Sequence, residues 1–123
     1  MVDNKDDNPA ASKRRVVIES PYAGDIPRNT RYARAAVRDS LERGEAPIAS
    51  HLLHTQPGIL REDVPEERQR GIDAGLAWHE VADAVIFYCD LGWSDGMKRA
   101  MANADKHRIL IDIRFLADWE DAS

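Results

Sequence analysis

The sequence predicts a parallel α/β fold, in which helices cover both faces of one β-sheet. Short apolar segments alternate along the chain with longer segments of helical periodicity, and this alternation is typical of parallel sheets. Right-handed crossovers between the strands then place helices on both faces of the sheet. The chain has 123 residues, which is long enough for one domain with a single core.

Four short apolar segments are predicted to be the strands. Residues 15–19 contain "VVI", a continuous apolar run that indicates a strand buried on both faces. The other three are "APIAS" at residues 46–50, "AVIFY" at 84–88 and "ILIDI" at 109–113.

Three helices are expected between these strands. The first runs from about residue 27 to residue 43, where Gly44 supplies the stop. The second begins at a proline followed by two glutamates and covers residues 65–82. The third covers residues 95–106.

Composition and charge restrict the class of protein. Residues 1–13 are polar and without periodicity, so we expect a disordered tail before a single domain at residues 14–123. No apolar run is long enough for a membrane span, and the start of the chain is not a signal peptide. The net charge of −5 argues against binding to a nucleic-acid polymer. With a single cysteine, Cys89, we expect a cytoplasmic protein.

Three loops with unusual chemistry follow the first three predicted strands. They are "SPYAGD" at residues 20–25, "SHLLHT" at 50–55 and "DLGWSDG" at 90–96. The second belongs to a long connection, which raises the expectation of function. Because ligands of such sheets bind at the carboxyl ends of the strands, we expect the site there.

The first and third loops carry groups suited to an anion. Gly24 allows close backbone approach, and the Ser20 hydroxyl can bond a phosphate or ribose oxygen. Ser94 and Gly96 stand at a helix start, where free N–H groups attract anions. Arg31 is near enough in sequence to reach a phosphate. An ordinary turn and an ordinary N-cap explain the same residues.

The remaining polar candidates are weaker. His51 and His54 lie three residues apart, but no nearby group completes a metal site. We therefore expect no metal and no cofactor, and a His51 hydrogen bond to substrate is preferred. Possible acid–base groups on or after the second helix are expected to be mostly at the surface, and they are Asp73, His79, Glu80 and Asp83.

Several motifs together resemble the nucleoside 2-deoxyribosyltransferase-like superfamily, within it a branch of bacterial and phage proteins. They are "VVIESPYAGD", "RYARAAVRDSLERGEAPIASHLLHTQ", "PEERQRGIDAGLAW" and "DLGWSDGMK", and with the last strand they span most of residues 15–114. The resemblance implies a flavodoxin-like three-layer sandwich with a four- to five-stranded parallel sheet. It also implies a homodimer or larger homo-oligomer.

The resemblance further implies a nucleoside or nucleotide ligand whose base–sugar bond is cleaved or exchanged. In this reading the first corner and the third-helix start bind the substrate and its 5′-phosphate. The implied substrate-binding residues are Ser20, Pro21, Tyr22, Gly24, Arg31, Ser94, Gly96 and Met97.

The chain departs from the superfamily at its catalytic carboxylates. The pattern Ser-x-Gly-x-x-x-Glu ends here in Ala100, and the place of a second carboxylate falls near Gly75. Alanine cannot attack or stabilise the sugar carbon. One hypothesis is a divergent N-glycosidase or deoxyribosyltransferase that uses Asp90 or Asp95 with His51. The alternative is a non-catalytic nucleotide-binding sensor or sequestering protein.

Overall fold

The computed structural model describes residues 10, 12–116 and 118–119. Its centre is a four-stranded, all-parallel sheet. The strands are β1 (Arg15–Glu19), β2 (Ala46–Ile48), β3 (Ala84–Tyr88) and β4 (Ile111–Arg114). The helices are α2 (Ile26–Glu42), α3 (Ser50–Leu53), α4 (Pro65–Ala77) and α5 (Asp95–Lys106), with a 3₁₀ turn η1 (Trp78–Val81) after α4.

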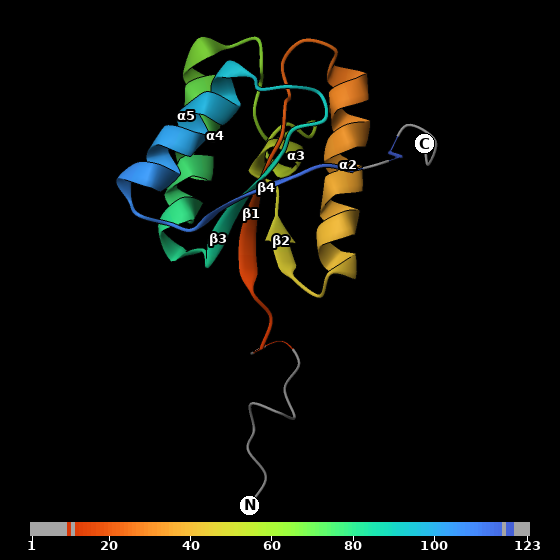
Figure 1. Ribbon diagram of the computed structural model, residues 1–123. Helices are drawn as coiled ribbons and strands as arrows, with labels where there is room; N and C mark the ends of the chain where they lie inside the picture. Colours follow the sequence, from red (N-terminus) through yellow and green to blue (C-terminus); the bar gives the residue numbers. More distant parts are fainter. Residues whose placement is uncertain (1–9, 11, 117, 120–123) are drawn as a thin grey trace, which may run out of the picture.

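The expected fold is confirmed. Figure 1 shows three layers, with α2 on one side of the sheet and α4 and α5 on the other. The strand order is β2-β1-β3-β4, so the chain first moves from β1 to β2 and later returns to the other side of β1. This flavodoxin-like order creates a switch point between β1 and β3, where loops diverge and leave room for a ligand.

The core forms two apolar layers, one on each face of the sheet. Alternate residues of β3 point to opposite layers, and the whole strand is buried. Ile86 packs towards Tyr32 of α2, whereas Phe87 packs towards Met97 of α5. Each fully buried side chain of this size contributes about 1.5–3 kcal/mol. The continuous apolar runs of β1 and β3 are thus explained by burial on both faces.

Two of the four α-helices that the structure describes, α2 and α5, begin with a side-chain cap. Asp25 Oδ1 accepts a hydrogen bond from the N–H of Arg28 at 3.2 Å, and Pro27 lies in the first turn of α2. Ser94 Oγ accepts from the N–H of Met97 at 3.2 Å and begins α5. These bonds satisfy donors that a helix leaves unpaired at its start.

Three element boundaries differ from the expected ones. The strand β2 ends at Ile48, because residues 50–53 turn into α3 instead of continuing as a loop. The strand β4 starts two residues late, since Arg108 adopts a left-handed φ of 55° and the N–H of Ile109 donates to Ala104 O at 2.9 Å. These features close α5 in the manner of a left-handed helix end. The second predicted helix ends at Ala77 and finishes as η1.

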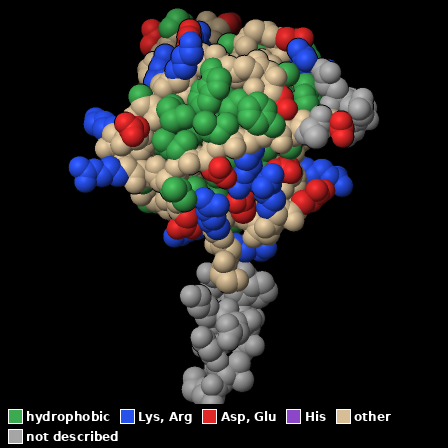
Figure 2. Space-filling view, in the orientation of Figure 1, with side chains coloured by type: hydrophobic (Ala, Val, Ile, Leu, Met, Phe, Trp, Pro, Cys, Tyr) green, Lys and Arg blue, Asp and Glu red, His purple; other side chains and the backbone are tan. Residues whose placement is uncertain are grey.

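The free edge of β4 carries exposed apolar side chains. Leu110 is 61% exposed, Ile113 49% and Phe115 65%. Figure 2 shows a continuous hydrophobic area on the face seen in Figure 1, where β4 passes in front of β1 and β2. The homo-oligomer implied by the resemblance remains a prediction.

The predicted N-terminal tail falls almost entirely outside the described residues. In the described part of the chain, no helix is both long enough and apolar enough to cross a bilayer. Cys89, the single cysteine, is buried at the end of β3, and burial raises the pKa of its thiol.

Candidate functional site

A cavity of about 620 Å³ opens at the carboxyl end of the sheet, beside the switch point. It is lined by the loops after β1 and β3, by α3, by the start of α5 and by one face of α4. Of the eleven predicted catalytic and substrate-binding residues, seven border it, namely Ser20, Tyr22, Gly24, His51, Ser94, Asp95 and Gly96. The three loops that the sequence pointed to therefore meet at one cavity.

Four other sequence-predicted residues do not line this cavity. Pro21 and Met97 are buried, and Arg31 is exposed on α2. Asp90 connects three segments of the fold, because its Oδ2 accepts from the Tyr32 hydroxyl at 2.5 Å and from the N–H of Leu116 at 2.8 Å. Because one oxygen accepts both hydrogen bonds, Asp90 connects the end of β3 to α2 and to the segment after β4.

The first corner is held in shape by α2. Asn29 Nδ2 donates to the carbonyl oxygens of Tyr22 at 2.9 Å and Ala23 at 3.0 Å. Gly24 has a φ of 105°, a conformation that favours glycine. The carbonyl groups of Tyr22 and Ala23 accept hydrogen bonds from the buried Asn29. These bonds hold the corner in place as a wall of the cavity.

His51 of α3 forms a pair with Ser20 at this wall. Ser20 Oγ and His51 Nε2 are 2.8 Å apart. Burial lowers the pKa of His51 below its ordinary value, while the charge of Glu19 opposes this shift. At neutral pH the ring is therefore neutral. Its Nε2 can either accept a hydrogen bond from the Ser20 hydroxyl or donate one to it, depending on the tautomer.

Glu19, the last residue of β1, is a cavity residue that sequence reasoning missed. Its Oε2 lies 2.9 Å from Nε2 of His79, which is fully buried. His79 Nδ1 lies 2.9 Å from Asn103 Nδ2 on α5. Of the four acid–base groups expected to be mostly at the surface, Asp73, Glu80 and Asp83 are exposed, and His79 of η1 is the buried exception. The one available signal is a charged residue directly after the apolar run of β1.

The start of α5 forms another part of the cavity wall. Ser94, Asp95, Gly96 and Arg99 all border the cavity. Trp93 just before them is 37% exposed and stacks on Phe87 with ring centroids 5.1 Å apart. This wall combines helix N–H groups, a cationic side chain and an aromatic surface.

The charges lining the cavity are mixed. Arg68 and Arg99 supply positive charge from α4 and α5, and Glu19, Glu62 and Asp95 supply negative charge. Within the part of the chain that the structure describes, no cluster of three metal-ligating side chains is found. The lining therefore offers both cationic and anionic side chains to a ligand.

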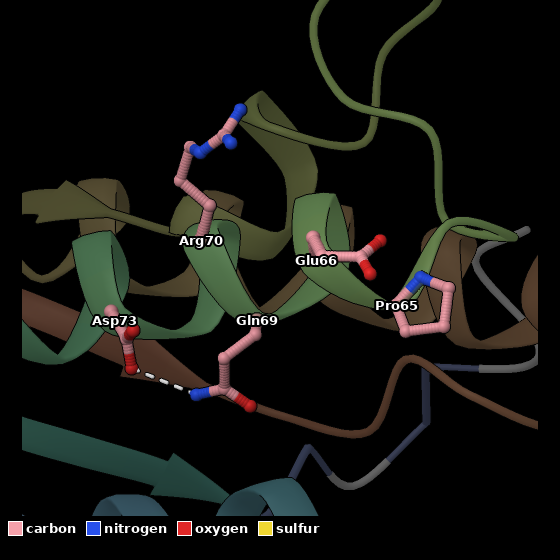
Figure 3. Close-up of a pocket in the computed structure, with 5 residues that line it drawn as sticks. All are labelled: Pro65, Glu66, Gln69, Arg70 and Asp73. Atoms are coloured by element: carbon pink, nitrogen blue, oxygen red, sulfur yellow. Dashed lines mark hydrogen bonds between the residues drawn. The ribbon is translucent and has the colours of Figure 1, made fainter.

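The chain has no carboxylate at the two positions where the resemblance places one, although Gly75 and Ala100 both border the cavity. Ala100 is 1% exposed and packs with Met97 in the α5 layer. A Cβ added at Gly75 would lie 2.4 Å from Ser50 Oγ, so α3 occupies the space of a side chain there. Asp73 offers no substitute, because its Oδ1 accepts from Gln69 Nε2 at 2.8 Å in a separate hollow on α4 (Figure 3).

Replacing Gly75 by alanine is expected to lower the free energy of unfolding by about 1–3 kcal/mol. The added methyl group would also lie 3.2 Å from Ser50 Cβ, so the Ser50 hydroxyl must turn away and its Cβ must move slightly. Urea denaturation measures the change. The double variant G75A/S50G removes the contact, and we expect it to lose less than the two single variants together. A G75A protein more stable than the wild type would contradict this packing.

Fold and cavity together define the class of this protein, a flavodoxin-like α/β protein with a polar, charged cavity at the switch point of its sheet. Within that class, the chain belongs to the family described as Domain of unknown function (DUF7768), whose model matches residues 14–114. That range begins just before β1 and ends with β4. No match was found among the curated proteins.

Proposed function

We propose that the cavity binds a nucleoside or nucleoside 5′-monophosphate, and that the protein cleaves its base–sugar bond as an N-glycosidase or deoxyribosyltransferase. The observation that carries this proposal is the meeting of both polar corners at one cavity. A carboxylate and a neutral histidine, Glu19 and His51, line the same cavity. The resemblance of the motifs supports the same ligand class.

The 5′-phosphate is expected at the start of α5. This helix has 12 residues, so its first turn presents free N–H groups with a partial positive charge. Gly96 leaves the backbone of that turn accessible, and a Cβ there would approach nothing closer than 3.8 Å. Arg68 and Arg99 add full positive charges from two helices.

The sugar is expected between the two corners, beside Glu19 and the Ser20–His51 pair. Cleavage of a glycosidic bond develops positive charge at the sugar carbon, and a nearby carboxylate stabilises that charge. The indole of Trp93 and the side chains of Leu60 and Leu76 offer an apolar surface to the base.

A non-catalytic nucleotide sensor or sequestering protein is the second candidate. It is favoured by one specific observation: Gly75 and Ala100 border the cavity at the two positions where the resembling enzymes have carboxylates. Such a protein would bind the same ligands through the same corners and release them unchanged.

The deciding experiment incubates the wild-type protein with a panel of nucleosides and their 5′-monophosphates and separates the products by chromatography. We expect free base from at least one monophosphate. Binding by calorimetry without release of base would favour the sensor. Neither binding nor release across the panel would contradict both functions.

Two further expectations belong to the same proposal. The partner is a nucleoside-type small molecule, and the chain works as a homo-oligomer in the cytoplasm. The exposed apolar edge of β4 is consistent with self-association.

A further inference from the structure

Glu19 lines the cavity, and one of its carboxylate oxygens is held by a hydrogen bond within the protein. Its side chain is 15% exposed, and Oε2 accepts a hydrogen bond from His79 Nε2 at 2.9 Å. Among the residues that the structure describes, none donates a hydrogen bond to the other oxygen, Oε1. Because Glu19 lines the cavity, this oxygen is available to a bound ligand or water molecule.

The hydrogen bonds behind Glu19 fix the orientation of its carboxylate. Asn103 Nδ2 donates to Leu76 O at 3.2 Å, and it lies 2.9 Å from His79 Nδ1. An amide NH₂ group has no acceptor capacity, so Nδ1 accepts and the ring proton lies on Nε2. That proton is donated to Glu19. The hydrogen bonds therefore run from Asn103 of α5 through His79 of η1 to Glu19 of β1, and each residue donates to the next.

A carboxylate at this position is not required by the packing of the sheet. Val17, two residues earlier on the same face of β1, is 3% exposed and belongs to the apolar layer under α5. The hydrogen-bonded side chains of Glu19, His79 and Asn103 lose contact with water when they are buried there. An apolar side chain in place of Glu19 would avoid this desolvation cost. The arrangement is therefore better explained by a task at the cavity.

Glu19 also supplies the group that α5 lacks. Ala100 lines the same cavity from α5, in the place where the resembling enzymes have a glutamate. In this chain the strand β1 brings a carboxylate to the cavity instead. Of the two carboxylates predicted from the sequence, Asp90 does not line the cavity, and Asp95 lines it from the start of α5 and not from β1.

We propose that Glu19 is the catalytic carboxylate of this cavity, and that His79 and Asn103 are its positioning residues; this rests on the proposed function. Oε1 accepts a proton from a water molecule as the water oxygen bonds to C1′ of the sugar. The bond between C1′ and the base nitrogen breaks, and its electron pair leaves with the base. The base nitrogen takes a proton from solvent, and Glu19 returns its proton to solvent. Nucleotide and water thus give free base and sugar phosphate.

The test compares Glu19→Gln with the wild type on the best substrate of the panel. Glutamine keeps the size of the side chain but cannot accept the proton of the water. We expect kcat to fall by at least about 100-fold, while the dissociation constant for the nucleotide changes less than about threefold. Glu42→Gln is the matched control, because Glu42 is an exposed carboxylate of α2 paired with Arg38, and it should keep the wild-type kcat.

The positioning role is tested at His79. His79→Leu removes the donor to Glu19 and is expected to lower kcat about 10–100-fold, with KM nearly unchanged. His79→Gln keeps an N–H donor and should restore most of the loss. If the leucine variant fails to fold, the Glu19→Gln comparison still decides the proposal. Equal kcat values for both His79 variants would overturn the positioning role.

The two failures are distinguishable. An active wild type with an equally active Glu19→Gln variant would overturn the catalytic assignment and leave the proposed function intact. A wild type that releases no base from any compound of the panel would overturn both.

Discussion

Replacing Arg114 by leucine is expected to lower the free energy of unfolding by about 3 kcal/mol, at the lower end of the effect of breaking a buried ion pair. The guanidinium donates to both oxygens of Glu45, at 2.8 Å and 2.7 Å, and to the Tyr88 hydroxyl at 3.1 Å. The two charged side chains are only 7% and 8% exposed. Leucine would leave a buried carboxylate that only Ser40 and Arg14 still partner.

Urea denaturation at neutral pH measures this loss. Arg38→Leu is the matched control, because the pair of Arg38 with Glu42 is 82% and 65% exposed and should change stability by no more than about 0.5 kcal/mol. The double variant R114L/E45L removes both charges, so we expect it to be more stable than R114L alone. An R114L protein as stable as the control would contradict the importance of this pair.

The same ion pair predicts a dependence on pH. Hydrogen bonds from Arg114 hold the pKa of Glu45 below its ordinary value. A group with a lowered pKa in the folded state stabilises the protein above its unfolded pKa, here about 4.3, and this contribution is lost as the pH falls through the folded value. The stability difference between wild type and R114L should therefore be complete at pH 7 and shrink in acid.

Replacing Arg99 by glutamine is expected to weaken the binding of a nucleoside 5′-monophosphate by about 10–100-fold. Arg99 borders the cavity one turn after Ser94 and Gly96, where we place the phosphate. A hydrogen bond between charged groups contributes about 1.5–3 kcal/mol, which corresponds to that loss of affinity. Binding of the uncharged nucleoside should hardly change.

Calorimetry with the monophosphate and the nucleoside separates these contributions. Lys98→Gln is the matched control, because Lys98 is the adjacent exposed residue of α5 and does not line the cavity. Both variants lose one positive charge, so a long-range effect would weaken binding equally in the two. Equal losses, or a loss that is the same for the nucleoside, would contradict the phosphate position.

Much of the fold could be predicted because its signals are local. The apolar runs of β1 and β3 and the cap at Ser94 are each visible in a few consecutive residues. The parallel order of the strands then follows from the alternation of strand and helix. Ligands of parallel sheets bind at the carboxyl ends of the strands. This general rule was sufficient to predict that the loops at Ser20, His51 and Ser94 meet at one cavity.

The parts that could not be predicted depend on contacts between distant segments. Glu19 and His79 are 60 residues apart, and Arg114 and Glu45 are 69 residues apart. No periodicity indicates that such groups will meet. His79 in particular lies in a helical segment of mixed polarity, and only the 3₁₀ turn at the end of α4 makes it fully buried.

Asp90 is a residue that was predicted to be in the site but does not line the cavity. It follows a buried strand at the carboxyl edge of the sheet, which favours a position in the site. In the structure its Oδ2 is instead bonded by Tyr32 and by the N–H of Leu116, whereas the neighbouring loop residues Ser94 and Asp95 reach the cavity. Residues in one short loop can therefore face different directions, and sequence proximity alone does not assign them.

A crystal structure of the protein soaked with a nucleoside 5′-monophosphate tests the central claim most directly. We predict density in the cavity between Ser20 and Ser94, with the phosphate at the first turn of α5 and C1′ of the sugar facing Oε1 of Glu19. Free base beside a separate sugar phosphate would be the same result after turnover. An empty cavity at saturating nucleotide, or a nucleotide bound elsewhere on the molecule, would contradict the claim.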